Sequence, residues 1–331
     1  MFNIAFIGCG RISKNHFQAI LDNRDITELK YLCDIDIEKA RLKKDEFFNK
    51  EEIIITDNYE EILKDNSIDV VVITTDSGSH YEIGKKVLLA NKHLLIEKPM
   101  AIRSEDALDM TNIANKKNLQ LGVCHQNRFN KTCYTVKENI ENDTIKNIAS
   151  LSVRVLWNRD ENYYGLADWR GKKKTDGSIL HNQCIHGIDM LLWYANSNVK
   201  EVYSIGNRFF RNFEFDDHIH SIVEFENGII AHIEGSVIVH GGNLEETLDI
   251  CAENAYIRLG GKALNEFYVS RLNNTDEYFS DIKEEIKDVY GNGHTFLYRN
   301  YFNALAGKEK LVVSSKEAFK AIELINKIAE R

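Results

Sequence analysis

An apolar run that leads directly into two closely spaced glycines restricts the fold of this chain more than any other feature. Residues 2–7 are FNIAFI, and Gly8-Cys9-Gly10-Arg11-Ile12-Ser13 follows at once, before a stretch with helical spacing at 14–23. In a G-x-G-x-x-S turn the first glycine permits the tight bend and the second lets the backbone approach a pyrophosphate, while a small third residue packs helix against strand. The segment predicts a strand–turn–helix unit that holds phosphates at a helix N-terminus. Its expected cofactor-binding residues are Gly8, Gly10, Arg11 and Ile12.

A carboxylate at the end of the second expected strand predicts which dinucleotide binds. Residues 29–33 form this strand, and Asp34 follows it, 21 residues after Ser13. A carboxylate there accepts hydrogen bonds from the ribose hydroxyls and repels a 2′-phosphate. The next residue is Ile35 rather than an arginine, so we expect NAD rather than NADP. An ordinary turn residue is the alternative interpretation of Asp34.

The rest of the first half alternates between strand and helix patterns. Such alternation predicts a doubly wound parallel sheet of the Rossmann type, with ligands at the carboxyl ends of its strands. We therefore expect an α/β NAD-binding domain over residues 1–123, with Gly8, Asp34, Thr75 and Lys98 at strand ends. The expected strands are 69–74, 93–96 and 119–123, and the expected helices are 81–91 and 104–117.

The chain has a single proline, Pro99, directly after Glu97-Lys98 at the end of the strand at 93–96. A chain of this length with average usage would contain roughly 16 prolines. Its retention at this position indicates a fixed φ or a cis peptide bond. A simple strand-ending turn is the alternative.

The second half changes to a period of two, which predicts an α+β domain over residues 124–331 with a large, mostly antiparallel sheet. Asn227-Gly228 predicts a hairpin between two of the strands. Helices or another subunit must cover each face of such a sheet. The expected strands are 148–157, 221–225, 229–234, 246–251, 255–259 and 266–269, followed by a closing amphipathic helix at 316–330.

Residues 177–189, GSILHNQCIHGID, are the richest segment in polar side chains suited to catalysis. On a regular helix Asn182 and His186 share a face, and so do His186 and Asp189. Imidazole titrates near pH 6.5, so His186 is suited to proton transfer, whereas an amide can only orient a substrate. A buried core histidine is the alternative interpretation of His186.

Together these motifs resemble the Gfo/Idh/MocA family of NAD(P)-dependent oxidoreductases over essentially the whole chain. The resemblance implies that Lys98 is catalytic and that the Lys98–Pro99 bond is cis. Two positions depart from the family pattern: Asp76 stands where a proline is usual, and Asn182 stands where an aspartate is usual. Acid–base chemistry should therefore concentrate on Lys98 and His186. The implied cofactor contacts also include Thr74, Thr75, His80, Glu97 and Lys98.

The form N-Q-x-x-H-G-x-D, with upstream aromatic and arginine residues, resembles one branch of the family, the UDP-N-acetylglucosaminuronate 3-dehydrogenases of surface-glycan biosynthesis. Aromatic rings suit pyranose and uracil faces, and arginines suit a carboxylate and a diphosphate. Two alternatives remain: a dehydrogenase of a free sugar or inositol, and a catalytically silent NAD(H)-binding regulator, against which the presence of Lys98 and His186 argues. The expected substrate-binding residues are Lys98, Gln126, Arg128, Arg159, Tyr164, Trp169, Arg170, Asn182 and His186.

Composition excludes several other classes of protein. A net charge of −9 argues against nucleic-acid binding, and no apolar stretch of 18 residues predicts a membrane span. Met1 leads directly into a strand-like run, and the cysteines lack C-x-x-C spacing, so we expect a cytoplasmic protein with reduced thiols. The histidines lack a compact ligand pattern, so we expect no metal. The resemblance implies a homodimer or homotetramer through the C-terminal sheet. The sequence leaves open whether NADH is released or is reoxidised in place by a second substrate.

Overall fold

Strand β1 (Phe2–Ile7) lies at the centre of a parallel sheet, because its residues from Ile4 to Ile7 are apolar and buried. The computed structural model describes residues 1–286 and 289–330, and in them the first sheet has the order β3-β2-β1-β4-β5-β6 with every neighbouring pair parallel. This confirms the predicted Rossmann sheet, whose order reverses between β1 and β4, where such folds bind ligands. The other strands are β2 (Thr27–Cys33), β3 (Ile54–Thr56), β4 (Val70–Ile73), β5 (His93–Ile96) and β6 (Leu121–Val123).

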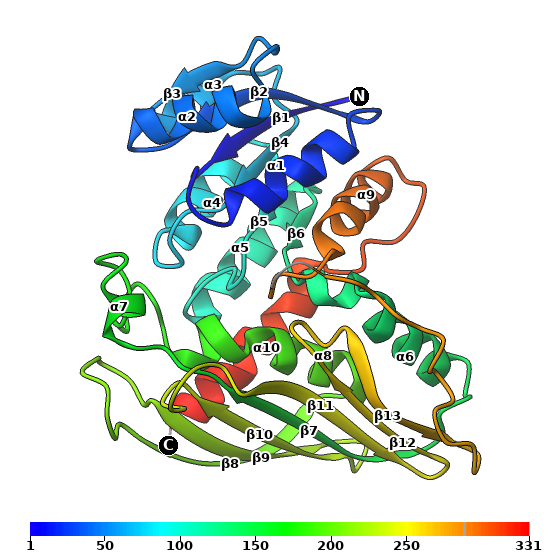
Figure 1. The fold of residues 1–331 in the computed structure, drawn as a ribbon. Coiled ribbons are helices and arrows are strands. Elements are labelled where there is room, and N and C mark those ends of the chain that lie inside the picture. The colour runs from blue at the N-terminus through cyan, green and yellow to red at the C-terminus, as the bar shows by residue number, and fades with distance from the viewer. Residues whose placement is uncertain (287–288, 331) are drawn as a thin grey trace. The chain divides into compact units, whose positions relative to one another are not determined.

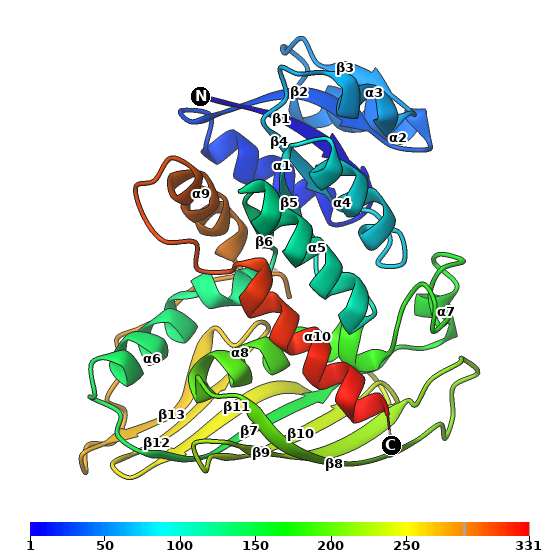
Figure 2. The same ribbon diagram turned by 180° about the vertical axis from the view of Figure 1, so that it is seen from behind.

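Helices cover both faces of this sheet. Figures 1 and 2 show α1 and α9 against one face and α4 and α5 against the other. Aromatic packing fixes α1, since Phe17 lies 4.7 Å from Phe6 of β1 between ring centroids. The helices are α1 (Ser13–Asp22), α2 (Ile37–Phe47), α3 (Tyr59–Lys64), α4 (His80–Leu89), α5 (Ser104–Lys117) and α9 (Gly293–Leu305).

A late segment of the chain, His294–Phe319, packs with Met1–Cys124 to form the first of two structural units. The sequence placed this segment in the second domain, because the strand–helix alternation stops near residue 123. In the structure, buried aromatic side chains pack this segment against the first unit. Phe302 lies 5.6 Å from Phe2 between ring centroids, and Gln120 Nε2 donates a hydrogen bond of 2.7 Å to the Tyr301 carbonyl. The second unit consists of His125–Gly293 and Lys320–Arg331.

The second unit contains the predicted large sheet, in the order β13-β12-β11-β7-β10-β9-β8 over the described residues. Its pairs are antiparallel except β7 with β10, so the mostly antiparallel sheet is confirmed. The predicted hairpin joins β9 to β10, and Gly228 at its turn has φ of +87°. The strands are β7 (Ile148–Leu156), β8 (Val199–Asn207), β9 (His218–Phe225), β10 (Ile230–Ser236), β11 (Glu245–Ala252), β12 (Ala255–Gly260) and β13 (Glu266–Leu272).

The helices of the second unit lie on one face of its sheet (Figures 1 and 2). Helix α8 packs tightly on β7, since a Cβ on Gly187 would lie 2.6 Å from Val153 Cγ1. The opposite face, which we call the open face, carries the exposed side chains of Tyr203, Ile205 and Ile222. The helical segments are η1 (Gln126–Phe129), α6 (Lys131–Glu141), α7 (Glu161–Tyr164), the π-turn η2 (Leu180–Cys184), α8 (Ile185–Ala195) and, from Lys320 onward, α10 (Ser315–Ala329). None of the helices in the described ranges has the length and apolar character needed to cross a bilayer.

The returning helix should be essential for the stability of the first unit. Phe302→Ala should lower its free energy of unfolding by about 3–5 kcal/mol, because it removes a buried ring and leaves a cavity. Phe296 on the same helix is 57% exposed and provides the control, with a change within about 0.5 kcal/mol for Phe296→Ala. Urea denaturation of both variants tests this. Equal effects would contradict the placement of Phe302 in the core.

Candidate active site

The glycine turn after β1 has the geometry that a phosphate-binding turn requires. Gly8 has φ of +101°, and a Cβ there would lie 2.7 Å from Thr75 N, so only glycine fits. A Cβ on Gly10 would meet nothing within 4 Å, which leaves the backbone accessible. Ser13 is fully buried, and its hydroxyl donates to the Gly10 carbonyl at 2.7 Å. The serine at the third motif position is therefore small enough to be buried and stabilises the turn through this hydrogen bond. Arg11 is exposed, and Ile12 is partly exposed at the first turn of the helix.

Asp34 is held against this turn by backbone hydrogen bonds. Its Oδ2 accepts from Cys9 N at 2.7 Å, and its Oδ1 accepts from Asp36 N at 2.9 Å. Each carboxylate oxygen keeps a further lone pair that a ribose hydroxyl can use. Ile35 is 94% exposed and brings no positive charge to the position that a 2′-phosphate would need. The local geometry therefore suits NAD.

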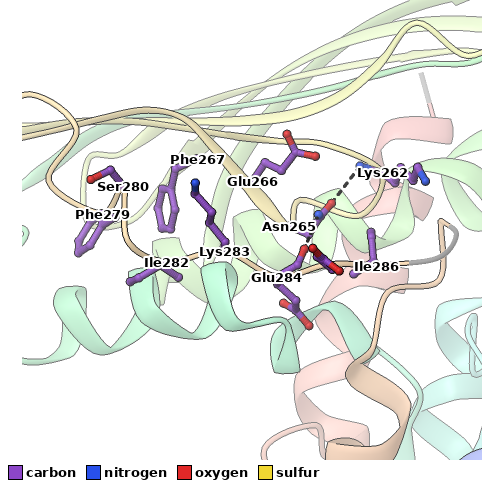
Figure 3. Close-up of a pocket in the computed structure, with 11 residues that line it drawn as sticks. Lys262, Asn265, Glu266, Phe267, Phe279, Ser280, Ile282, Lys283, Glu284 and Ile286 are labelled. Atoms are coloured by element: carbon purple, nitrogen blue, oxygen red, sulfur yellow. Dashed lines mark hydrogen bonds between the residues drawn. The ribbon is translucent and has the colours of Figure 1, made fainter.

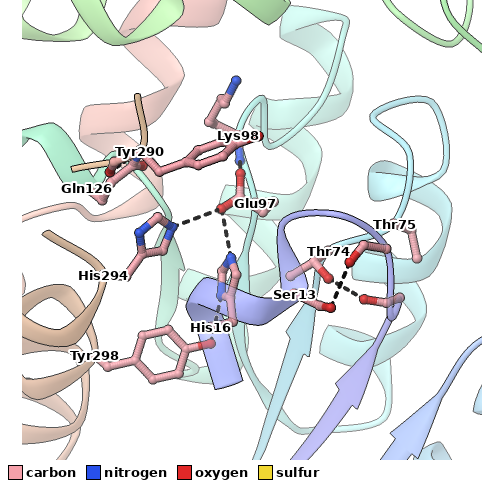
Figure 4. Close-up of polar contacts among 12 residues, drawn as sticks. Ser13, His16, Thr74, Thr75, Glu97, Lys98, Gln126, Tyr290, His294 and Tyr298 are labelled. Carbon is pink, nitrogen blue, oxygen red and sulfur yellow. Dashed lines mark hydrogen bonds and ion pairs between the residues drawn. The ribbon is translucent and has the colours of Figure 1, made fainter. Parts of the chain in front are cut away.

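The Glu97-Lys98-Pro99 motif follows β5, and its Lys98–Pro99 bond is cis, which confirms the prediction. Glu97 was predicted to contact the cofactor, but its carboxylate is buried and points to His16 of α1. His16 Nε2 lies 2.9 Å from Glu97 Oε1, and Glu97 Oε2 accepts from Lys98 N at 3.1 Å (Figure 4). The Lys98 side chain extends away from this group (Figure 4). Glu97 therefore orients the backbone of Lys98.

The protonation states of this buried group follow from its hydrogen bonds. Burial would raise the pKa of Glu97, but the hydrogen bond from His16 and the His294 ring, 3.8 Å away, hold it well below its ordinary value. Burial lowers the pKa of His16, against the opposing effect of Glu97. A neutral His16 satisfies both of its partners: Nε2–H donates to Glu97, and Nδ1 accepts from the Tyr298 hydroxyl at 2.8 Å. The first unit thus buries an ionised carboxylate behind Lys98.

His80 was predicted to contact the cofactor. In the structure its side chain is buried inside the first unit, between two loops. Its Nδ1 lies 2.7 Å from the Pro99 carbonyl, and its Nε2 lies 3.2 Å from the Thr75 carbonyl. The ring therefore joins the loops after β4 and β5. Thr74 ties the first of these loops to the glycine turn, since its hydroxyl donates to the Gly8 carbonyl at 2.5 Å. Hydrogen bonds thus connect the ends of β1, β2 and β4, and the His80 ring lies between the loops after β4 and β5.

Asn182 does not share the expected face with His186 and Asp189, which are three residues apart on the regular helix α8. Residues 180–184 form the π-turn η2, in which hydrogen bonds run from i to i+5, so residues four apart no longer align. Asn182 Nδ2 donates to Asp176, whose other oxygen accepts from Gly171 N at 2.8 Å. Asp189 points into the core. Asn182 is instead tied to the loop that carries Trp169 and Arg170.

Arg128, which was predicted to bind substrate, forms a buried ion pair in the structure. Its guanidinium is buried and donates to both oxygens of Asp189, at 2.8 Å from Nε and 2.7 Å from Nη2. It also lies over the Trp193 ring, 5.1 Å from the centroid. Burial would raise the pKa of Asp189, but the Arg128 charge lowers it. Arg128 therefore fixes the η1 turn to α8.

This ion pair positions two predicted site residues next to each other. Gln126 belongs to η1 and His186 to the first turn of α8. Gln126 Nε2 lies 3.4 Å from His186 Nε2, and His125 packs edge-on against the His186 ring at 6.1 Å. His186 is partly exposed, whereas Gln126 and His125 are buried. The structure thus presents one imidazole edge beside an amide.

An arginine–aromatic cluster lies in the same unit, around the Tyr163 ring. Arg159 and Arg170 lie 4.8 and 4.3 Å from its centroid, and each also covers a tryptophan, Trp157 and Trp169 respectively. Tyr164 packs edge-on against the Tyr163 ring at 5.2 Å and on its other side against Phe213 at 4.4 Å, between ring centroids. The cluster combines two guanidinium groups with broad aromatic faces.

Sequence reasoning missed Gln183, which connects this cluster to η2. It donates to the Tyr163 hydroxyl at 3.1 Å and accepts from Arg159 Nε at 3.2 Å. The signal was present, because Gln183 is part of the N-Q-x-x-H motif.

A cavity of about 540 Å³ lies elsewhere in the second unit (Figure 3). Residues from 262–267 and 279–286 line it, and none of the predicted site residues is among them. It is therefore separate from the site predicted from the sequence.

Comparison with known families explains both units. Residues 2–125 match the NAD-binding Rossmann model of the Gfo/Idh/MocA oxidoreductases, and residues 134–258 match the model of the Gfo/Idh/MocA C-terminal domain. The chain belongs to this family. The first unit is accordingly an NAD-binding domain, and the protein is an oxidoreductase of a family that acts on sugars and inositols.

Two solved structures resemble this member of the family over nearly the whole chain. The WlbA dehydrogenase of Chromobacterium violaceum is 30% identical with a TM-score of 0.89, covering 99% of this chain and 93% of that one. The WlbA dehydrogenase of Bordetella pertussis is 28% identical with a TM-score of 0.88, covering 99% and 95%. Both were solved with NADH and UDP-GlcNAcA. The uncharacterized oxidoreductase YrbE of Bacillus subtilis is 29% identical over 70% of this chain, and the match spans 65% of YrbE, just under two thirds.

Buried neutral histidines should make the stability of the first unit depend on pH. Burial lowers the pKa of His16 and of His80, so the unfolded chain binds more protons below about pH 6.5. Stability should therefore fall as pH decreases from about 6.5 toward 5, by up to about 1.4 kcal/mol per pH unit for each histidine.

The variant His16→Gln should show a shallower dependence, because one of these protons is no longer taken up. Urea denaturation of both proteins at several pH values between about 7.5 and 5 measures the two slopes. Identical slopes would show that His16 is not a buried neutral group.

Proposed function

We propose that this NAD-dependent oxidoreductase oxidises a secondary hydroxyl of a nucleotide sugar, at C3 of a UDP-N-acetyl-hexuronate. The observation that carries the proposal is the arginine–aromatic cluster of Trp157, Arg159, Tyr163, Trp169 and Arg170. The likeness over 99% of the chain to two structures that contain UDP-GlcNAcA supports it.

The chemistry of this cluster matches the charges of such a substrate. A UDP-hexuronate carries a diphosphate and a carboxylate, and guanidinium groups bind both with paired hydrogen bonds. Aromatic faces stack on uracil and on the apolar side of a pyranose. A neutral sugar or an inositol offers no charge to Arg159 or Arg170. These two arginines therefore favour an anionic substrate over a free sugar.

The proposed reaction removes a hydride from the carbon and a proton from its hydroxyl. Bound NAD would accept the hydride, with Gly8, Gly10 and Asp34 holding the cofactor. The Lys98 ammonium would stabilise the developing alkoxide, and His186 would accept the hydroxyl proton. Glu97 would keep the Lys98 backbone in place through its hydrogen bond to Lys98 N. Asn182 would orient substrate without carrying its proton.

A panel of substrates tests the proposal. The enzyme and NAD are mixed with UDP-GlcNAcA, UDP-GlcNAc, free hexoses and inositols, and NADH absorbance is recorded at enzyme concentrations high enough to detect a single turnover. Adding a 2-oxo acid shows whether NADH is recycled in place. Reduction of NAD by UDP-GlcNAcA alone is expected. Reaction only with neutral sugars or inositols would favour the alternative dehydrogenase, and no reaction with any compound would favour a silent NAD(H)-binding protein.

Replacing the two acid–base residues should impair turnover and leave cofactor binding intact. Lys98→Ala and His186→Ala should each lower kcat by about 10²–10⁴-fold, because each removes a group that handles the hydroxyl proton or its charge. Asn182→Ala should lower kcat by a smaller factor, since an amide does not transfer protons. Steady-state kinetics and NADH titration measure both quantities. A His186→Ala enzyme with unimpaired kcat would exclude the histidine from the mechanism.

The carboxylate of Asp34 should set the preference for NAD. Asp34→Ala should weaken NAD binding and reduce the discrimination against NADP, because the hydrogen bonds to ribose and the repulsion of a 2′-phosphate are both lost. Fluorescence titration with each dinucleotide measures the change. Equal or tighter binding of NADP by the unmodified protein would refute this role.

The open face of the second sheet should mediate self-association. Tyr203 and Ile205 on β8 are 64% and 74% exposed, and large exposed apolar side chains on a sheet are typical of an interface. Light scattering should give at least twice the 38.1 kDa chain mass. The variant Ile205→Glu should shift the population toward monomer. A monomeric unmodified protein at micromolar concentration would contradict the proposal.

A further inference from the structure

A group of histidines and one glutamate lies on the open face of the second sheet, apart from every residue of the proposed reaction. His218 and His220 are two residues apart on β9, so both side chains lie on the same face. Glu234 on β10 pairs directly with His220 in the antiparallel register. No compact ligand pattern is visible in the sequence here, because the third residue comes from the neighbouring strand.

The potential ligand atoms converge at metal-binding distances. One ring nitrogen of each histidine and one carboxylate oxygen of Glu234 all lie within 4.8 Å of one another. The Nε2 atoms of His218 and His220 are 3.0 Å apart. Around a tetrahedral zinc ion with Zn–N bonds of about 2.0–2.1 Å, neighbouring nitrogens are about 3.3–3.4 Å apart. Small shifts of the two rings would therefore accommodate an ion.

Neighbouring side chains hold these groups in place. His220 Nδ1 lies 3.3 Å from His232 Nε2, and His232 Nδ1 lies 3.4 Å from Ser152 Oγ. If each Nδ1 carries the proton, His220 donates to His232, His232 donates to Ser152, and Nε2 of His220 keeps its lone pair for a ligand bond. Arg154 Nε donates to Glu234 Oε2 at 2.8 Å. Partners of this kind orient the ligands in most protein metal sites.

His218 adds a second, independent observation. Its Nδ1 is shielded from solvent and has no hydrogen-bond partner among the residues that the structure describes. A buried polar atom without a partner is often explained by an ion or water.

We infer that His218, His220 and Glu234 bind a divalent transition-metal ion, with zinc the best match to two imidazoles and one carboxylate. Three protein ligands leave one coordination position for water or another donor. His232 is a positioning residue in this account, because it acts on the ion through His220.

The first unit offers an instructive contrast. His16, Glu97 and Cys124 also lie within 4.8 Å of one another, but they are buried. Burial, and then the Glu97 charge, raises the pKa of the Cys124 thiol well above its ordinary value. A protonated thiol is a poor metal ligand, and Glu97 already accepts hydrogen bonds from His16 and Lys98 N. That cluster carries no metal proposal.

Zinc titration of the full-length protein tests the inference. Protein treated with a chelator and then freed of it is titrated with zinc chloride by calorimetry, and cobalt chloride gives a visible spectrum that reports the ligands. We expect saturable binding of one zinc ion per chain. His220→Ala and Glu234→Gln should each weaken it by at least about 100-fold, by loss of a ligand. His240→Ala removes an exposed histidine outside the cluster and should bind zinc as the unmodified protein does.

The positioning role has its own readout. His232→Ala should weaken zinc binding by about 10–100-fold, while the visible spectrum at saturating cobalt keeps the ligand signature of the unmodified protein. Far-UV circular dichroism and urea denaturation of every variant show that the second unit is folded, and His218→Asn provides a second ligand variant if His220→Ala fails this control. Absence of saturable zinc binding by the unmodified protein would overturn the inference. So would binding by His218→Asn, His220→Ala and Glu234→Gln that is as tight as binding by the unmodified protein. The histidines would then form only a hydrogen-bonded row.

Discussion

The buried carboxylate of Glu97 is the interaction on which the first unit most depends. It accepts from His16 of α1 and from the backbone of Lys98, while His16 also accepts from Tyr298 of α9. Helix α1, the loop that carries Lys98 and helix α9 therefore share one hydrogen-bonded group. Removing one partner of a buried charged group costs about 3–5 kcal/mol. Such a cost explains why these segments adopt one arrangement.

In the second unit, a buried ion pair likewise connects two segments. Arg128 and Asp189 fix η1 to α8, and this brings Gln126 beside His186. The π-turn before α8 then directs Asn182 toward Asp176 and the loop of Trp169 and Arg170. Each unit thus places one proposed acid–base group, Lys98 or His186, on a segment that a buried charge holds. Rigid support of this kind is what precise positioning of reacting groups requires.

The cofactor half of the site could be predicted from the sequence because each of its residues directly follows a recognisable strand pattern. Gly8, Asp34 and Lys98 each follow an apolar strand run, and parallel alternation brings such strand ends to one edge. The buried partners of Arg128 and Glu97 could not be predicted for the opposite reason: Asp189 and His16 are distant from them in sequence. Gln183 and the π-turn were missed because helical spacing alone suggests regular α-helix. The return of 294–319 to the first unit depends on Phe302 packing on Phe2, which no local pattern encodes.

The most direct test of the account follows the hydride itself. UDP-GlcNAcA carrying deuterium at C3 is incubated with the enzyme and NAD, and the nucleotide is recovered for mass spectrometry. We expect the reduced cofactor to contain the deuterium and the sugar to become a 3-keto derivative. Reduced cofactor without deuterium would place the oxidation at another carbon. A cofactor that stays oxidised with this substrate would contradict the assignment of a UDP-hexuronate.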